Sequence, residues 1–481
     1  NVEGNCFAPC TEGEKPEDES ARRWWRVILW ESADLFFGEL LYVAVAIFLV
    51  RKSGPGWQIS VVMASVYLSV PLAVMRLGVA SAIYASDVIV PLVLAGLAIR
   101  RPPWFVSWVS EPETRSIALA SILIPICMGL VLSMAGVYTF GIADAQYFFR
   151  QVCYVGVFVL CAGMSSEHFA VDGFARLTVL LTLGLVVAGL LQYGGVVDWD
   201  VFTPLTGRES AGLGTLGVGF LGLFRGSVGH FCAFGGLFFL YLTVSRGAMV
   251  LTGSFGWALC LIVLVLSTSR AGILAHAVGV ALAVLLAFRG DALRIVVVTG
   301  SVSLLAFLVY SSAPSLMGDP TLDRLRPSSG VLMGSEDVST TGRVEMWRLS
   351  LTYFVDQPSR LLTGVGPAAD VQMADFLGGF GAHNEFIDIV FKGGLLALYA
   401  LLQFYWRVAR RIAAALPASR PSSAFGLAFV AATFVIALPQ NALIGKHASH
   451  GAILLTYATL GVFCGGAGRL VADRNAPSGR S

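Results

Sequence analysis

Long apolar runs, separated by short polar segments, make up most of the chain. A bilayer core of about 30 Å takes about 20 apolar residues as a helix, and lipid cannot pair backbone N–H and C=O groups, so these runs predict membrane-spanning helices. About thirteen runs are long enough for this. The sequence therefore predicts an all-α polytopic membrane protein with about 12–13 transmembrane helices. The runs cover residues 33–50, 58–75, 83–99, 117–139, 146–164, 174–193, 229–246, 249–267, 271–288, 292–312, 384–406, 424–443 and 449–468.

Composition also indicates a membrane protein and excludes a soluble enzyme. Charged residues make up 13% of the chain and hydrophobic residues 56%, whereas charged residues make up about 25% of a typical globular protein. The formal net charge is only +2, and the 32 Lys and Arg residues are spread over short segments between apolar runs. Because nucleic-acid binding requires a concentrated basic patch, we expect no nucleic-acid partner.

The positions of Lys and Arg predict the orientation of the helices, since cytoplasmic segments hold the excess of basic residues. The C-terminus is then cytoplasmic, and two long loops, residues 194–228 and 313–383, face outward. The predicted orientation fits less well with three basic residues before the first run, Arg22, Arg23 and Arg26. We therefore expect an interfacial helix at Arg22–Leu29 or one re-entrant run. The basic segments contain Arg51, Lys52, Arg100, Arg101, Arg115, Arg289, Arg294, Arg407, Arg410, Arg411, Arg420, Arg469 and Arg474.

The loop at 313–383 is long for a connection without structure, so we expect it to carry helices of its own. The apolar positions from Glu345 to Phe354 suit a short amphipathic helix. The membrane body reads as one unit without internal repeats. The expected parts are an acidic leader with the interfacial segment (1–32), transmembrane helices with the outer loop 194–228 (33–312), the large outer loop (313–383), C-terminal transmembrane helices (384–470) and a cytoplasmic tail (471–481).

Cysteine and acidic residues do not indicate a metal centre. Six of the 8 cysteines lie in apolar runs, where they pack as small apolar side chains. Cys6 and Cys10 lie in the acidic leader and could form a disulfide in an oxidising compartment. Asp198 and Asp200 resemble the acidic pair that some sugar-nucleotide transferases use for a divalent cation, but a solvated loop explains them better. No His or Cys spacing indicates zinc, so we expect neither a metal nor another cofactor.

Three arginines stand at the outer ends of predicted helices or in the large outer loop: Arg225, Arg270 and Arg343. Arginine binds phosphate and pyrophosphate through two parallel hydrogen bonds and keeps its charge at all relevant pH values. Each arginine could instead only extend to the lipid headgroups. For Arg270 the binding role is favoured, because positive charge on the outer side runs against the orientation rule.

His383 directly precedes the run that follows the large loop. The dipole at a helix N-terminus opposes protonation, so this imidazole is expected to be neutral and able to act as a general base. Asn384 is a candidate helix cap. His230, His447 and His450 also lie near the outer face, so the position of the base is not unique by topology.

The order of these motifs resembles the O-antigen ligase and polymerase superfamily of bacterial membrane glycosyltransferases. The resemblance rests on an Arg-Gly-Ser segment at Arg225, the turn Ser267–Gly272, the outer loop with Arg343 and Trp347, Gly364–Gly366, and His383 with Asn384. It covers roughly residues 210–410. It implies a helical fold of the glycosyltransferase C type with a large periplasmic loop.

The resemblance also implies an activity. Such enzymes sit in the bacterial inner membrane and transfer a glycan from undecaprenyl pyrophosphate to an acceptor hydroxyl at the periplasmic face, with inversion and without a metal. Arg225 and Arg270 would hold the pyrophosphate, with Arg343 as a less certain partner, and His383 would be the base. Asn384, Glu385 and Trp347 would support the acceptor or the loop.

The acceptor decides between members of this group. Lipid A core would define an O-antigen ligase, which we favour, a second lipid-linked glycan would define a polymerase of O-antigen or exopolysaccharide, and a pilin residue would define a protein glycosylase. A secondary transporter is the alternative from another class. Transporters place their substrate sites near the bilayer midplane on broken helices, in matched halves, whereas the candidate residues here lie at one face.

Overall fold

The structure is a computed structural model that describes residues 55–68, 71–77, 79–167, 171–193, 196, 225–245, 250–267, 269–289, 341–367, 369, 384–439, 442–444 and 450–475. The N-terminal leader, the runs predicted over 33–50 and 292–312, and nearly all of the outer loop 194–228 lie outside these residues.

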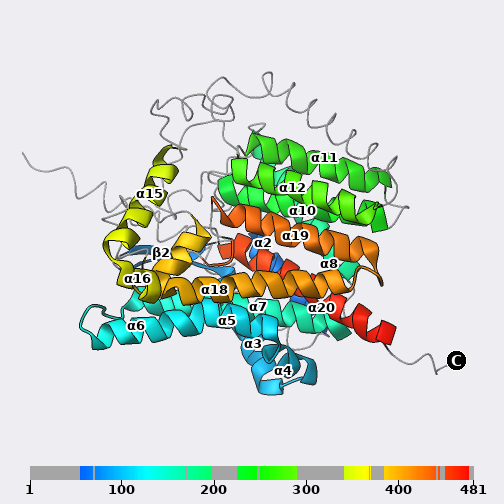
Figure 1. Ribbon diagram of the computed structural model, residues 1–481. Coiled ribbons are helices and arrows are strands. Elements are labelled where there is room, and N and C mark those ends of the chain that lie inside the picture. The colour runs from blue at the N-terminus through cyan, green and yellow to red at the C-terminus, as the bar shows by residue number, and fades with distance from the viewer. Residues whose placement is uncertain are drawn as a thin grey trace, which may run out of the picture.

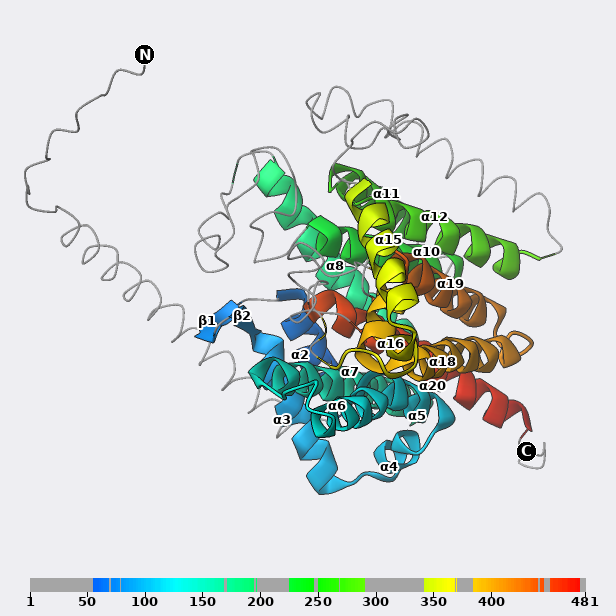
Figure 2. The ribbon, with the colours of Figure 1, turned by 60° about the vertical axis from the view of Figure 1, so that its left-hand side comes forward.

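Helices lying side by side form the body of the molecule (Figures 1 and 2). Helix α20 is the central one, because 94% of its apolar window is buried, compared with 39% for α8 at the periphery. The closest helix pairs are α7 with α20, α10 with α11, and α12 with α19. The helices are α2 (Pro55–Leu68), α3 (Ala85–Arg100), α4 (Pro103–Val109), α5 (Pro112–Ala118), the π-helix η1 (Leu119–Leu123), α6 (Ile124–Met134), α7 (Ile142–Glu167), α8 (Val171–Tyr193), α10 (Arg225–Ser245), α11 (Val250–Leu266), α12 (Arg270–Ala287), α15 (Thr341–Asp356), α16 (Pro358–Thr363), α18 (Glu385–Ala414), α19 (Arg420–Ala437) and α20 (His450–Asn475).

Seven described helical segments are long and apolar enough to cross a membrane, or up to eight if the bent pair Ser86–Arg100 and Pro103–Val109 is one span. This confirms the predicted all-α polytopic membrane protein. The described part of the chain thus holds fewer full-length spans than the count from sequence. Two predicted runs account for part of the difference, because residues 58–75 and 384–406 do not form single continuous helices.

The run predicted over residues 58–75 was wrong as a single helix. Helix α2 ends at Leu68, and the chain continues as an antiparallel hairpin of β1 (Pro71–Leu77) and β2 (Val79–Tyr84). Pro71 has no N–H to donate to a helix, and its ring clashes with the preceding turn. A short apolar run has no periodicity that distinguishes a strand from a buried helix, so the pattern alone could not reveal the hairpin.

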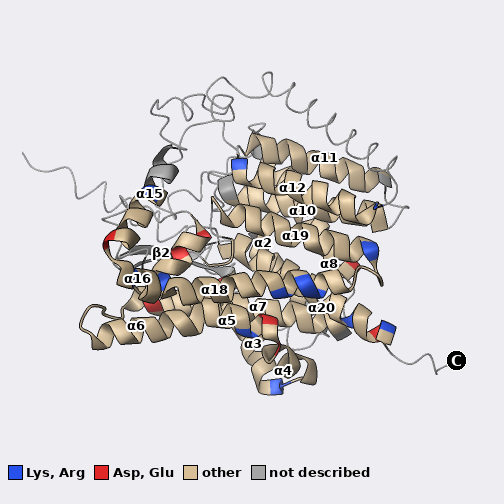
Figure 3. Ribbon diagram, in the orientation of Figure 1, with Lys and Arg blue, Asp and Glu red and all other residues tan. Residues whose placement is uncertain are grey.

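Several arginines lie at one end of the bundle, which we call the basic end. Arg420, at the start of α19, donates a hydrogen bond to the carbonyl oxygen of Arg289 just after α12, at 3.3 Å. Arg407, in the last part of α18, donates to the carbonyl oxygen of Pro112 at 2.8 Å and to Ser116 Oγ at 2.9 Å. Between its ends, the helical surface carries few charged residues (Figure 3).

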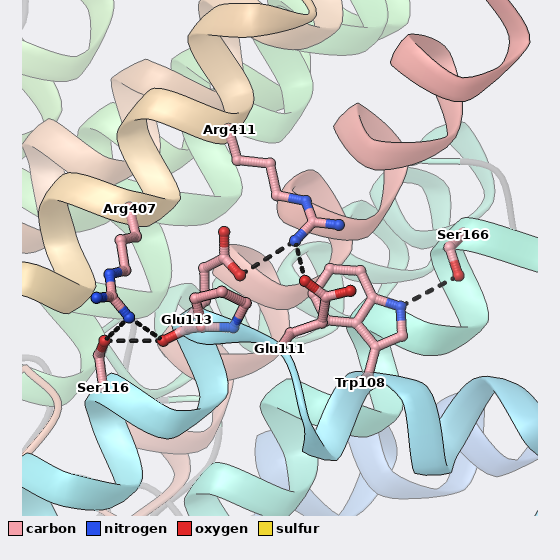
Figure 4. A network of polar contacts seen from close by, with 8 residues as sticks. Trp108, Glu111, Glu113, Ser116, Ser166, Arg407 and Arg411 are labelled. Atoms are coloured by element: carbon pink, nitrogen blue, oxygen red, sulfur yellow. Dashed lines mark hydrogen bonds and ion pairs between the residues drawn. The ribbon is translucent and has the colours of Figure 1, made fainter.

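Arg411 ties three segments together at the basic end (Figure 4). Its Nη1 contacts Glu111 at 2.8 Å and Glu113 at 3.1 Å, and its guanidinium lies 4.5 Å from the ring centre of Trp108. Trp108 in turn donates to Ser166 Oγ at 3.3 Å.

Helix α18 is two helices joined by a sharp reversal. Gly393 and Gly394 have non-helical backbone angles, and the hydroxyl of Tyr405 lies 3.5 Å from Glu385 Oε1 although 20 residues separate them. A continuous helix would hold these residues about 30 Å apart. The short helix 385–392 therefore folds back against the long helix 395–414, as the first turns of α18 in Figure 1 show.

This reversal corrects the span predicted over residues 384–406. The long helix 395–414 has a length of about 30 Å, which matches a bilayer core, whereas the preceding short helix lies beside it. Gly394 has a φ of 68°, a conformation that glycine adopts without the steric cost of a Cβ. Hydropathy does not separate the two helices, because both are rich in apolar residues.

The long loop predicted over residues 313–383 does carry helices, as expected. Helix α15 includes the amphipathic segment expected at Glu345–Phe354, and α16 follows it directly. The ring of Phe354 packs on Phe391 with centroids 4.6 Å apart. The backbone N–H groups of Val365 and Gly366 donate to the carbonyl oxygen of Phe391 at 2.6 and 3.3 Å. These bonds attach the loop helices to the reversal in α18. The irregular backbone there leaves the carbonyl oxygen of Phe391 available to accept them.

Candidate functional site

The first turns of α10 and α12 meet at the end of the bundle opposite the basic end, which we call the far end. A Cβ on Gly272 would lie only 2.8 Å from the carbonyl oxygen of Gly229, so the two backbones touch. Ser269 caps α12, because its Oγ accepts a hydrogen bond from the N–H of Gly272 at 3.3 Å. Ser269 and Gly272 of the Ser267–Gly272 turn thus explain the close approach of the two helices.

Two of the predicted arginines stand at this junction. Arg225 is the first residue of α10 and Arg270 the first residue of α12. Arg270 is exposed, and the side chain of Arg225 lies outside the described part. Two helix N-termini side by side add their positive partial charges. An anion such as a phosphate group suits this kind of position.

The start of α18 is held by side chains that bond to backbone. His383 lies outside the described residues, and Asn384 follows it as the helix cap. The Oδ1 of Asn384 accepts hydrogen bonds from the N–H groups of Phe386 at 3.0 Å and Ile387 at 3.1 Å. The predicted capping role of Asn384 is confirmed. Glu385 is fully buried and accepts hydrogen bonds from the loop between α19 and α20.

Two buried histidines have partners that fit a structural role. The Nε2 of His230 lies 2.9 Å from the hydroxyl of Thr456. His276 lies 2.9 Å from the carbonyl oxygen of Ala233 through Nδ1 and accepts from the indole N–H of Trp257 at 2.9 Å through Nε2. Both imidazoles lie in the helical core and are almost without solvent exposure. They are therefore poor candidates for a base that must reach a substrate.

His450, the first residue of α20, belongs to a buried polar cluster with Asp87, Arg150 and Tyr154. Its Nδ1 lies 2.8 Å from the hydroxyl of Tyr154, and its Nε2 lies 3.2 Å from Asp87 Oδ1. Arg150 donates to both carboxylate oxygens of Asp87, at 3.2 and 2.9 Å. The cluster joins α3, α7 and α20 at the far end. His450 is thus hydrogen-bonded through Nδ1, and its Nε2 lies next to a carboxylate.

Asp87 and Arg150 were not among the residues predicted from the sequence. A signal was present, because each is a charged residue inside a predicted apolar run, and such residues in membrane proteins have partners or a function. The pairing itself could not be predicted, since 63 residues separate the two side chains. Only the packing of α3 on α7 brings them together.

The other predicted loop residues lie on α15. Arg343 is in its first turn, with a side chain outside the described part, and Trp347 is half-buried. Gly364 and Gly366 have φ values of 73° and 134°, which only glycine adopts without strain. A Cβ on Gly364 would lie 2.7 Å from the carbonyl oxygen of Phe391. The Gly364–Gly366 motif therefore serves the docking of the loop on α18.

No group of three His, Cys, Asp or Glu side chains within the described ranges could hold a metal ion. Asp198 and Asp200 lie outside those ranges, as do Cys6 and Cys10. The cysteines that the structure describes are free thiols. The predicted absence of a metal stays a prediction.

Comparison with known families gives a match over residues 255–402, to the family described as O-antigen ligase. This match over part of the chain supports the resemblance to the O-antigen ligase and polymerase superfamily. No curated protein matches the chain. The matched O-antigen ligase segment begins within α11 and ends within α18, so it includes Arg270 and the start of α18. Arg225 precedes it, and the structure connects α10 to the segment through Gly229 and Gly272.

Proposed function

We propose that this protein transfers a glycan from undecaprenyl pyrophosphate to an acceptor hydroxyl at the periplasmic face of the bacterial inner membrane. The favoured reaction is that of an O-antigen ligase, with lipid A core as the acceptor. The observation that supports it best is the contact between Gly229 and Gly272 at the far end, because it brings together the helix N-termini that carry Arg225 and Arg270. The proposal places that end at the periplasmic face, because the basic residues gather at the other end and cytoplasmic segments hold the excess of Lys and Arg.

In this proposal Arg225 and Arg270 hold the pyrophosphate, with Arg343 as a further contact from the outer loop. His383 takes the proton from the acceptor hydroxyl as the acceptor oxygen attacks the anomeric carbon. The bond from this carbon to the pyrophosphate oxygen breaks, and undecaprenyl pyrophosphate leaves with its negative charge stabilised by the arginines. Attack opposite the leaving group inverts the anomeric configuration, and the proposed reaction requires no metal.

The burial of two competing histidines, His230 and His450, supports His383 as the base, because both are bonded within the protein. The third competing histidine, His447, lies outside the described residues. Asn384 and Glu385 support the loop rather than the acceptor, because their oxygens are bonded to backbone N–H groups. Trp347 remains a proposed contact to the acceptor or the loop.

A polymerase that joins lipid-linked repeat units of O-antigen or exopolysaccharide is the second candidate. Its chemistry at Arg225, Arg270 and His383 would be the same, and only the acceptor would differ. The broken helix α18 is a feature that transporters also have, so the test must separate transport from transfer. A transporter moves its substrate unchanged, whereas a transferase forms a new glycosidic bond and releases undecaprenyl pyrophosphate.

The test is a transfer assay with the purified full chain in lipid nanodiscs. The donor is a glycan on undecaprenyl pyrophosphate, and lipid A core and a second lipid-linked glycan are offered separately, with and without a metal chelator. Chelator-resistant transfer to the core that is lost in His383→Ala supports a ligase with this base. Lengthening of the lipid-linked glycan instead supports a polymerase, and an untouched donor under all conditions refutes the transferase proposal.

A further inference from the structure

Glu385 is a carboxylate fully enclosed by protein at the start of α18. Its Oε2 accepts hydrogen bonds from the backbone N–H groups of Ala442 at 2.5 Å and Leu443 at 2.7 Å, in the loop between α19 and α20. Both hydrogen bonds end on one oxygen, so this single side chain satisfies two buried backbone donors. A buried carboxylate without such partners would be strongly unfavourable, so this contact determines where the start of α18 lies.

Because of the reversal in α18, this contact holds the first turn of the short helix inside the bundle. Because the helix 385–392 folds back on the helix 395–414, its first residue lies between the long helix and α19. Phe434 of α19 contacts both sides of this arrangement, with ring centroids 5.0 Å from Phe386 and 5.6 Å from Tyr405. The first turn of the short helix is therefore fixed inside the bundle and not at a free loop end.

The short helix is also buried along a charged face. Glu385, Asp388 and Lys392 occupy positions spaced by three and four residues, and all three are almost without solvent exposure. Lys392 Nζ lies 5.4 Å from the ring centre of Tyr147 on α7. Charged residues with helical spacing share one face, so this helix is attached to the bundle along its whole length.

The loop that Glu385 holds is anchored at its other end as well. Helix α20 begins at His450, which bonds to Tyr154 on α7 and contacts Asp87 on α3. Ala442 and Leu443 are themselves fully buried. The Glu385 side chain is thus bonded to buried backbone, and burial of a supporting contact is what holds a reactive group in place.

We infer that Glu385 is a positioning residue, which fixes the first turn of the short helix against the α19–α20 loop and thereby sets the place of the proposed base His383, two residues earlier. The inference rests on the proposed function for the identity of the base. A displacement of a reactive group by about 1 Å can slow a reaction about a hundredfold. Glu385 thus acts on the rate of transfer and not on donor binding, which is assigned to the arginines of α10 and α12.

The experiment compares Glu385→Gln with Glu385→Asp in the full chain in nanodiscs. Glu385→Gln leaves an amide oxygen, a weaker acceptor than a carboxylate oxygen, for the two backbone N–H groups, and places an N–H₂ group near the Tyr405 hydroxyl. We expect kcat for transfer to fall by about tenfold to a hundredfold, with the KM for the lipid-linked donor changed less than about threefold. Glu385→Asp keeps the charge and should restore part of kcat. Tyr405→Phe removes only the contact at 3.5 Å and is the matched control, with kcat close to wild type.

Hydrogen exchange in the peptide that contains Ala442 and Leu443 gives a second readout, which does not depend on activity. We expect faster exchange in Glu385→Gln than in Tyr405→Phe. Unchanged kcat per folded molecule in Glu385→Gln, or unchanged exchange in this peptide, overturns the positioning role while wild-type transfer stands. Transfer that survives His383→Ala overturns the proposed base, and with it the role assigned to Glu385.

Discussion

Gly229 and Gly272 bring the first turns of α10 and α12 into direct backbone contact, although 43 positions separate them in the sequence. A Cβ on Gly272 would lie 2.8 Å from the carbonyl oxygen of Gly229 and 3.0 Å from a methyl group of Leu264. The backbone carbonyl cannot move without its helix. A side chain at position 272 must therefore separate the two helix N-termini that carry Arg225 and Arg270.

We expect Gly272→Ala to lower both stability and transfer. Overpacking of this kind costs about 1–3 kcal/mol, and the separation of the two N-termini weakens the proposed pyrophosphate site. Gly184→Ala in α8 is the matched control, because no atom lies within 4 Å of its added Cβ. The measurements are the thermal unfolding midpoint in nanodiscs and the transfer rate per folded molecule. Equal values for the two variants would contradict the proposed role of this contact.

Arg225→Ala and Arg270→Ala should each reduce transfer by about a hundredfold to a thousandfold, because each removes charge that stabilises the leaving pyrophosphate. Arg225→Lys and Arg270→Lys should retain part of the rate, since lysine keeps the charge but not the two parallel hydrogen bonds. Arg469→Ala is the control, because Arg469 is half-exposed on α20 near the basic end. Initial rates at saturating donor and acceptor provide the measurement. Full activity in Arg270→Ala would refute the pyrophosphate site.

The sequence was sufficient to predict the class of protein and the helices that carry its candidate residues. Hydropathy identifies helices because the backbone in lipid must satisfy its own hydrogen bonds. Basic residues are expected to gather at one end of the helices, since one side of a membrane holds the excess of Lys and Arg. The residues that follow this rule include Arg100, Arg289, Arg411, Arg420 and Arg474. The helix within the large loop was predictable from amphipathic spacing. These features depend on local composition, which a single sequence contains.

Contacts between distant segments could not be predicted in the same way. The reversal at Gly394 needs a positive φ, and a pair of glycines in an apolar run is equally compatible with a continuous helix. The bonds of Glu385 to Ala442 and Leu443 join backbone groups that carry no sequence signal at all. Asp87 and Arg150 could have been noticed as charged residues inside apolar runs. Only the packing of the helices shows that they pair with each other.

Gly394→Ala should disrupt the reversal in α18. The residue has a φ of 68°, which costs a residue with a Cβ about 1–2 kcal/mol, and the new Cβ would overlap the carbonyl group of Leu362. We expect a lower unfolding midpoint and the loss of most transfer, since the short helix and the start of α18 would move. Gly96→Ala in α3 has no atom within 4 Å of the added Cβ and serves as the control. Wild-type transfer in Gly394→Ala would show that the reversal is not needed for activity.

Arg411→Ala tests whether a contact at the basic end can stabilise the protein without affecting the rate of transfer. The substitution leaves the carboxylates of Glu111 and Glu113 without their cation and removes a contact with Trp108. Because the guanidinium is partly exposed, the expected loss is about 1–3 kcal/mol, between the values for exposed and buried ion pairs. The exposed neighbour Arg410→Ala should have little effect. We expect the unfolding midpoint of Arg411→Ala to fall while the transfer rate per folded molecule stays at the wild-type value, because no proposed substrate contact lies at the basic end. A reduced rate per folded molecule at unchanged unfolding midpoint would instead assign this cluster a direct part in transfer.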